Sequence, residues 1–213
     1  MAIVTGGING PFKGKVGSII GYQLNGQNII KGLPRKSAKN KRGSVAQKAS
    51  RSKFTKIQRF LKPILPFIQV GFNMEGRSRQ LSAHNAAKSY NLLNAFTVEG
   101  ELDYSKVLVA HGNLPSPLSV QTATDDVGIH FSWTNNADSN GIYRDDQVML
   151  LVYNVKEGFS YFMLSGARRK AERETFEMWE GSKGKKFHTW IAFISDDRQQ
   201  ISMSTYTGEV VRS

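Results

Sequence analysis

The sequence predicts a mainly β protein of the α+β class: an N-terminal glycine-rich β-hairpin arm, one or two helices, and a C-terminal antiparallel β-sandwich. Three observations predict this class. From Lys106 onwards, short runs of β-branched and aromatic residues alternate with turn clusters, as in a sandwich. Over residues 44–61, apolar residues recur every three or four positions, which is typical of an amphipathic helix. Glycine is concentrated before residue 44, where a hairpin turn sequence also lies.

Residues 1–43 are predicted to form a glycine-rich basic β-arm. Nine of the 20 glycines lie here, and Asn25 and Gly26 have the composition of a two-residue hairpin turn. The flanking residues 18–24 and 27–31 are the predicted strands. Because an isolated hairpin is marginally stable in water, we expect it to join a larger sheet, either of its own domain or of a neighbour.

Residues 44–101 are predicted to form a helical linker region. The first helix begins after Ser44, a residue type that suits the N-cap, and extends to about residue 61. Its apolar face consists of Phe54, Ile57, Phe60, Leu61 and Ile64, and its other face is cationic. Pro63 and Pro66 should break the helix, so that residues 61–71 are a kinked or broken continuation. A second helix is predicted over residues 82–94.

Residues 102–213 are predicted to form the sandwich. Turn clusters divide this segment into short runs with the composition of strands. Strands are expected near residues 106–110, 118–122, 128–134, 146–154, 159–164, 173–178, 186–194 and 200–206. Trp133, in the run IHFSWT, is the expected anchor of the core.

All of the net positive charge comes from the first third of the chain. Residues 1–74 contain fourteen Lys and Arg and no Asp or Glu, whereas residues 75–213 contain fifteen and seventeen. Such an asymmetry indicates a polyanion partner or a charged interaction arm.

The residues that usually carry enzymatic chemistry form no recognisable motif. The chain has no cysteine, and its four histidines lie in different predicted elements. No serine occupies a nucleophile-elbow context, and the glycine-rich start lacks the spacing of a phosphate-binding loop. We therefore expect a protein that is not an enzyme and needs no cofactor. Distant residues that converge in space are the alternative.

One segment has a weak resemblance to a calcium loop. In residues 136–141, NADSNG, oxygen-bearing side chains alternate and a glycine follows, so the ligands would be Asn136, Asp138 and Asn140. The pattern departs from that loop because Gln147 stands in the place of the bidentate glutamate and strands are predicted on both sides. An Asx-rich turn is the better interpretation, and no metal is expected.

No apolar run approaches the roughly 20 residues that a membrane-spanning helix needs. The first fifteen residues also lack the apolar stretch of a secretory signal. We therefore expect synthesis in the cytoplasm without a signal peptide, and later release as part of an extracellular or virion-like assembly if the protein assembles.

Three blocks of sequence resemble a family of uncharacterised proteins found widely in Bacteroidota. They are GKVGSIIGYQLNGQNIIKGLP, QRFLKPILPFIQVGF and FISDDRQQISMSTYTGEVV, in that order. Within the sandwich, IHFSWT resembles the tryptophan-bearing early strand of an immunoglobulin-like or fibronectin type III-like domain, and WIAFIS resembles a late central strand. The resemblance implies this domain order, an immunoglobulin-like type of sandwich and a bacterial or phage setting, but no activity.

Two hypotheses follow for the arm. The first is a structural protein that self-assembles as a filament, shell or virion-like particle, because exposed strands can pair with strands of another copy. Its contact residues would be Ile19, Ile20, Tyr22, Leu24, Ile29 and Ile30.

The alternative is non-specific binding of nucleic acid by the basic segment 31–62, because lysines and arginines can neutralise phosphates. Its residues would be Lys31, Arg35, Lys36, Lys39, Lys41, Arg42, Lys48, Arg51, Lys53, Lys56, Arg59 and Lys62. The expected partners are thus other copies of the chain or nucleic acid, and no small-molecule substrate is inferred.

Overall fold

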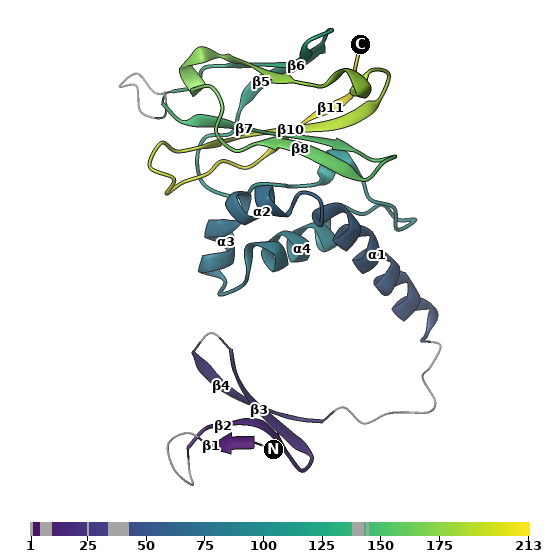
Figure 1. Ribbon diagram of the computed structural model, residues 1–213, viewed down its shortest axis with the longest axis vertical. Coiled ribbons are helices and arrows are strands. Elements are labelled where there is room, and N and C mark those ends of the chain that lie inside the picture. The colour runs from purple at the N-terminus through teal and green to yellow at the C-terminus, as the bar shows by residue number, and fades with distance from the viewer. Residues whose placement is uncertain (1, 5–9, 25, 34–42, 138–142, 144) are drawn as a thin grey trace. The chain divides into compact units, whose positions relative to one another are not determined.

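The chain divides into two units, Met1–Val45 and Ala46–Ser213. This boundary lies close to the predicted end of the arm at residue 43. The computed structural model describes residues 2–4, 10–24, 26–33, 43–137, 143 and 145–213 (Figure 1).

The first unit is a four-stranded antiparallel sheet in the order β1-β2-β3-β4. Its strands are β1 (Ala2–Val4), β2 (Phe12–Val16), β3 (Ile19–Leu24) and β4 (Gln27–Gly32). The predicted hairpin is the β3–β4 pair, in which Leu24 lies opposite Gln27. The larger sheet that we expected the hairpin to join is supplied by β1 and β2 of the same chain.

Two glycines shape this sheet. Gly17, with a φ of +54°, lies in the short turn that places Val16 opposite Ile19. Gly21 is buried and pairs with Gly14 on the neighbouring strand. A Cβ atom on Gly21 would overlap the backbone oxygen and the ring of Phe12, so only glycine fits there.

The second unit contains a two-sheet antiparallel β-sandwich, which confirms the predicted fold class. One sheet has the order β5-β6-β9 and the other the order β11-β10-β7-β8. The strands are β5 (Leu118–Thr124), β6 (Gly128–Thr134), β7 (Gln147–Asn154), β8 (Phe159–Met163), β9 (Arg173–Glu177), β10 (Lys186–Ile194) and β11 (Thr205–Val211). The second unit also contains the short 3-10 helices η2 (Tyr104–Lys106), η3 (Arg169–Ala171) and η4 (Glu180–Ser182).

Two strand predictions need correction. Residues 107–110 are buried but form no strand, because side chains rather than a neighbouring strand bind part of their backbone. The Asn91 amide accepts from Leu108 N–H and donates to Leu108 O, each at 2.9 Å, and the Ser204 hydroxyl accepts from Val109 N–H. The last strand begins at Thr205 instead of near residue 200.

The sandwich core lies between the two sheets. Trp133 is buried there as expected, with its ring 5.5 Å from that of Phe193, centre to centre. The Trp133 indole N–H donates to the backbone oxygen of Arg169 at 2.8 Å. Ile129 and Phe131 of β6 and Val148 and Leu150 of β7 belong to the same core cluster.

The helices cover the other face of the β11-β10-β7-β8 sheet and form a third layer (Figure 1). They are α1 (Val45–Leu61), α2 (Leu65–Gly71), α3 (Asn73–Ser78) and α4 (Ala83–Asn94). The Phe60 ring lies 5.0 Å from the Tyr153 ring and 5.9 Å from the Trp190 ring. Residues 44–101, which we expected to form a linker, therefore share a core with the sandwich.

The helix boundaries follow local sequence signals. Helix α1 ends at Leu61, just before Pro63, and Pro66 lies in the first turn of α2, where proline is tolerated. The Ser82 hydroxyl caps α4 by accepting from Asn85 N–H at 3.2 Å. Helix α3 was not predicted.

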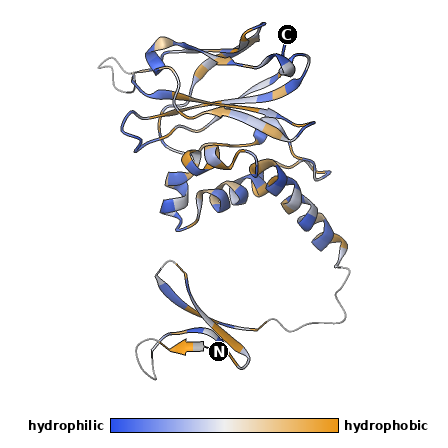
Figure 2. Ribbon diagram, in the orientation of Figure 1, coloured by the Kyte–Doolittle hydropathy of each residue, from blue (hydrophilic) through white to orange (hydrophobic). Residues whose placement is uncertain are grey.

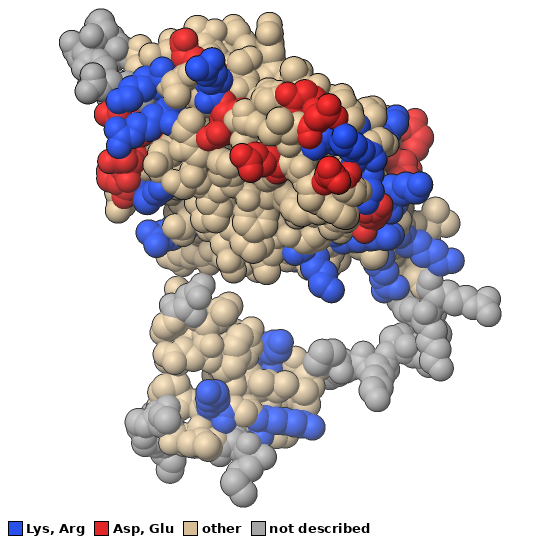
Figure 3. Space-filling model, turned by 45° about the horizontal axis from the view of Figure 1, so that its top comes forward, with Lys and Arg blue, Asp and Glu red and all other residues tan. Residues whose placement is uncertain are grey.

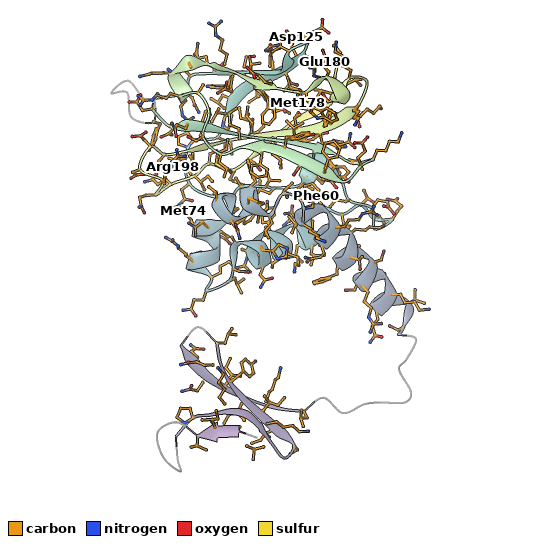
Figure 4. The ribbon with its side chains drawn as sticks, in the orientation of Figure 1. Phe60, Met74, Asp125, Met178, Glu180 and Arg198 are labelled. Carbon is orange, nitrogen blue, oxygen red and sulfur yellow. The ribbon has the colours of Figure 1, made fainter. Side chains whose placement is uncertain are left out.

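A buried arginine near the C-terminus closes one end of the sandwich. The Arg212 guanidinium donates to the backbone oxygens of Asp125 at 2.6 Å, Asp126 at 2.8 Å and Met178 at 3.1 Å. It thereby links β11 to the β5–β6 turn and to the end of β9, where Figure 4 labels Asp125 and Met178.

The packing of Gly21 generates a prediction for the N-terminal sheet. Gly21→Ala should destabilise that sheet by about 1 to 3 kcal/mol, because the new methyl group overlaps the β2 backbone. Gly32→Ala is the matched control, since a Cβ atom there meets nothing within 4 Å. Amide NMR spectra of the full-length chain should show loss of dispersed signals from residues 10–33 in Gly21→Ala alone. Equal spectra for the two variants would contradict this packing.

Candidate assembly and nucleic-acid surfaces

The two faces of the N-terminal sheet differ in charge. Side chains alternate between the faces along a strand, and directly paired residues share a face. The pairing Gly14–Gly21–Ile30 defines what we call the uncharged face, and the pairing Lys15–Ile20–Lys31 defines the lysine face. The uncharged face comprises Val4, Phe12, Gly14, Val16, Ile19, Gly21, Gln23, Asn28, Ile30 and Gly32. The lysine face comprises Ile3, Lys13, Lys15, Ile20, Tyr22, Leu24, Gln27, Ile29 and Lys31.

The uncharged face exposes large aliphatic side chains to solvent. Ile30 is 62% exposed, Val4 55% and Val16 49%. Gly21 is the only buried residue among those of this unit whose burial the structure describes. Figure 2 shows hydrophobic residues along these strands. Exposed aliphatic side chains that share one face of a sheet are a feature of interaction surfaces.

The lysine face combines ammonium groups with an aromatic ring. The Lys31 ammonium lies 5.1 Å from the centre of the Tyr22 ring, within the range of a cation–π contact. Ile20, Tyr22 and Ile29 are half-buried, whereas Ile3, Leu24 and the three lysines are exposed. Figure 3 shows Lys and Arg on this unit, and the sequence has no Asp or Glu before Glu75.

The structure separates the six predicted assembly residues. Ile19 and Ile30 lie on the uncharged face, whereas Ile20, Tyr22, Leu24 and Ile29 lie on the lysine face. Sequence reasoning missed the three large residues that β1 and β2 add to the uncharged face, which are Val4, Phe12 and Val16. The separation of the isoleucines could have been predicted. Each hairpin strand has two adjacent isoleucines, and neighbours in a strand must point to opposite faces.

Both outer edges of the sheet are open among the described residues. Strand β1 pairs only with β2, and β4 pairs only with β3. The inner strands β2 and β3 are paired on both sides, so for these two strands the chain itself supplies the pairing. An exposed edge still offers unpaired backbone groups to another strand.

Helix α1 carries most of the described cations of the alternative hypothesis. Lys48, Arg51, Arg59 and Lys62, which follows the helix, are exposed. No acidic residue lies in α1. The predicted residues Arg35, Lys36, Lys39, Lys41 and Arg42 lie outside the described residues.

Two of the predicted cations on α1 have partners within the protein. The Lys56 ammonium forms an ion pair with Glu101 at 2.6 Å and donates to the backbone oxygen of Gly100 at 2.9 Å. The Lys53 ammonium lies 5.5 Å from the centre of the Phe96 ring. Both side chains are half-buried, so they are less available to a polyanion than the four exposed cations.

The first half of α1 contains no buried residue. The buried residues of this helix are Ile57, Phe60 and Leu61, all in its second half. Phe54, which the helical pattern assigned to the core, is 48% exposed, and the Lys88 ammonium lies 4.8 Å from the centre of its ring. The assignment was wrong because α1 continues beyond the layer that covers its second half (Figure 1).

The calcium-loop alternative is not supported by the residue that can be placed. Asp138 and Asn140 lie outside the described residues. The Asn136 amide oxygen accepts from the Arg169 guanidinium, and its nitrogen donates to the backbone oxygen of Ser116 at 3.0 Å. Among the described residues, no group of three or more His, Asp or Glu side chains is placed to hold a metal.

The Arg169 cluster has a structural role. Arg169 is fully buried, pairs with Asp146 at 3.1 Å and lies 3.8 Å from the centre of the Phe193 ring. Burial raises the pKa of the Asp146 carboxyl, although the neighbouring guanidinium acts in the opposite direction. Removing either partner of such a pair leaves an uncompensated buried charge, which is strongly destabilising. The intact pair therefore keeps the loops that carry Arg169 and Asp146 in place.

His130, one of the four histidines, has local partners at the β5–β6 turn. The His130 ring lies 2.8 Å from the Asp125 carboxylate and 2.9 Å from the Thr175 hydroxyl. Asp125 also accepts from Gly128 N–H and Val127 N–H, and together with His130 these hydrogen bonds lower its pKa to about 2. These contacts fix the exposed β5–β6 turn.

No helix in the described part of the chain is long and apolar enough to cross a membrane.

Comparisons with known proteins identify a family for this chain. No curated protein matches the chain. A solved structure, the solution structure of the fn3 domain of the human collagen alpha-1(XX) chain, is 12% identical, with a TM-score of 0.36. The similarity covers 46% of this chain and 85% of that one. Residues 11–208 match the model described as "Family of unknown function (DUF6266)". Because this match spans most of its length, the chain belongs to the DUF6266 family of unknown function.

Proposed function

We propose that this chain is a non-enzymatic structural protein that assembles with other copies of itself through the uncharged face of its N-terminal sheet. The exposure of the aliphatic side chains on that face carries the proposal, since water is an unfavourable environment for such a surface. A filament, shell or virion-like particle in a bacterial or phage setting is the form that we infer. Synthesis in the cytoplasm and release with the assembly are part of the same proposal.

Charge favours another copy of the chain as the occupant of this face. Every copy has fourteen basic and no acidic residues before Glu75, so two copies repel one another where their cations meet. The uncharged face is the part of the sheet where two copies can meet without opposing lysines. A two-fold contact also places the same surface on both sides, which an uncharged apolar face can satisfy.

The shape of the face suits sheet-on-sheet packing. Two sheets pack about 10 Å apart when their side chains interdigitate. Gly14 and Gly32 have no side chains, so they leave room beside Val16, Ile19 and Ile30 for the aliphatic groups of a second sheet. The open edges of β1 and β4 supply a further mode of association, by addition of strands.

Non-specific nucleic-acid binding is a second candidate, favoured by the lysine face and by α1. Lys13, Lys15 and Lys31 share one face with Tyr22, and α1 exposes several cations without an acidic neighbour in the helix. Lysines and arginines neutralise phosphates regardless of base sequence. The two candidates are compatible, because assembly through the uncharged face leaves the lysine face uncovered.

The assembly proposal predicts a face-specific effect of charge. Ile30→Lys should convert assembled protein to monomer, because it buries an ammonium group in the contact. Gln27→Lys places the same charge on the lysine face of the same strand and should leave assembly unchanged. Sedimentation velocity over a range of protein concentrations measures both variants, and negative-stain imaging compares the full chain with one that begins at Ala46.

Large assemblies are expected for the full chain and for Gln27→Lys only. A full-length chain that stays monomeric at every concentration would refute the proposal, as would equal assembly of the Ile30→Lys variant.

The nucleic-acid candidate predicts a steep dependence on salt. If about six cations contact phosphates of a random duplex, log affinity should fall with log salt at a slope near −5. Replacing Lys13, Lys15 and Lys31 by glutamine should reduce the slope by about 3, measured by fluorescence anisotropy. Lys170 and Lys183 are control positions, since they already pair with Asp145 and Asp126. A slope that does not change on loss of the three lysines would exclude the lysine face.

A further inference from the structure

A pocket of about 390 Å³ opens on the second unit, between helices α2 and α3 and the ends of strands β8 and β10. A volume of this size is in the range of small-molecule sites. Figure 4 labels Met74 and Arg198 at this part of the body. Neither the fold nor the proposed assembly requires the pocket.

The pocket has an apolar interior and a polar rim. Val70, Met74, Leu164, Ile194 and Ile201 provide aliphatic and thioether surface, and Ile194 and Ile201 are buried. Neutral amide and hydroxyl groups, including those of Gln200 and Ser165, line the rim. An apolar pocket with a few placed polar groups is the usual form of a ligand site.

Arg198 supplies the only charge among the residues that line this pocket. Its guanidinium donates to the Ser165 hydroxyl at 2.8 Å, to the Gln147 amide oxygen and to the backbone oxygen of Leu164 at 3.5 Å. All three acceptors are neutral. Within the described part of the chain no carboxylate forms an ion pair with Arg198. The hydrogen-bond partners of this guanidinium in the described part of the chain are therefore all neutral.

The turn that carries Arg198 is fixed in an unfavourable conformation for arginine. Arg198 has a φ of +60°, a left-handed conformation that glycine adopts without strain. Hydrogen bonds impose it: the Asp197 carboxylate accepts from the Ser195 hydroxyl at 2.6 Å and from Gln199 N–H at 2.9 Å. The Ser195 hydroxyl also accepts from Gln200 N–H at 2.8 Å. An observed backbone outlier beside a pocket is a reason to look for a functional role.

We propose that this pocket binds a small aliphatic monocarboxylate, with its chain between Val70 and Ile201 and its carboxylate on the Arg198 guanidinium. An apolar chain matches the interior, and an arginine pairs with a carboxylate through parallel hydrogen bonds. Charge excludes the basic N-terminal segment of another copy as the occupant, because it would bring cations to Arg198. The site adds a ligand class that the sequence did not indicate.

Decanoate and decanol are suitable probes, because they share the aliphatic chain and differ in charge. Titration of the full-length Ile30→Lys variant, which is expected to be monomeric, followed by amide NMR, should show saturable decanoate shifts at residues 70, 74, 194 and 200. Decanol should bind at least about tenfold more weakly, since it has no charge to pair with the Arg198 guanidinium.

The decisive variant is Arg198→Gly, which removes the charge and suits the left-handed backbone. It should bind decanoate at least about tenfold more weakly without loss of thermal stability, so weaker binding cannot be attributed to unfolding. Arg173→Gln, on the other sheet, removes an exposed arginine as a control and should bind as the unmodified chain does. Equal decanoate affinity in the Arg198→Gly variant, shifts confined to other residues, or no saturable binding would each overturn the proposal.

Discussion

The N-terminal sheet leaves large aliphatic side chains in water, and the assembly that we propose depends on this exposure. In the second unit, both faces of the β11-β10-β7-β8 sheet are covered, one by the β5-β6-β9 sheet and the other by helices. The first unit has no comparable core among its described residues, since only Gly21 is buried. The two units therefore differ in how much of each sheet is buried among the described residues.

The distribution of charge between the two faces of the N-terminal sheet is the basis for the partner that we propose. Lys13, Lys15 and Lys31 lie on one face of the sheet, and the described residues of the other face include no lysine, because side chains alternate along each strand. In the assembly that we propose, the lysine face repels other copies and the uncharged face is where they meet. Of the fourteen basic residues before Glu75, only these three lie on the described strands of the sheet.

Much of the fold could be predicted from local signals. The Asn25 and Gly26 turn, the three- and four-residue apolar period of α1, and the β-branched runs of the sandwich each indicated an element that the structure contains. Strands β1 and β2 escaped notice because β1 is very short and β2 is a five-residue segment with glycine at its centre. The third layer was also missed. The continuous apolar run of β7 indicates burial on both faces, and that signal was available.

The candidate sites are formed by segments that lie far apart in the sequence, so no local pattern predicts them. The two faces of the first unit follow from the register of four strands, which the hairpin alone does not define. The exposure of Phe54 depends on where the helical layer ends, although its spacing in α1 suits a core residue. The carboxylate pocket joins α2 and α3 to a turn more than a hundred residues away, and no motif marks Arg198.

Cross-linking between copies tests the central claim most directly, because the chain contains no cysteine. A cysteine at position 30 lies on the uncharged face, and one at position 31 lies on the lysine face of the same strand. A bismaleimide with a span of about 10 Å, the separation of packed sheets, should join copies of the Ile30→Cys variant into covalent dimers. It should leave the Lys31→Cys variant monomeric. Dimers of both variants in equal yield, or of neither, would contradict assembly through the uncharged face.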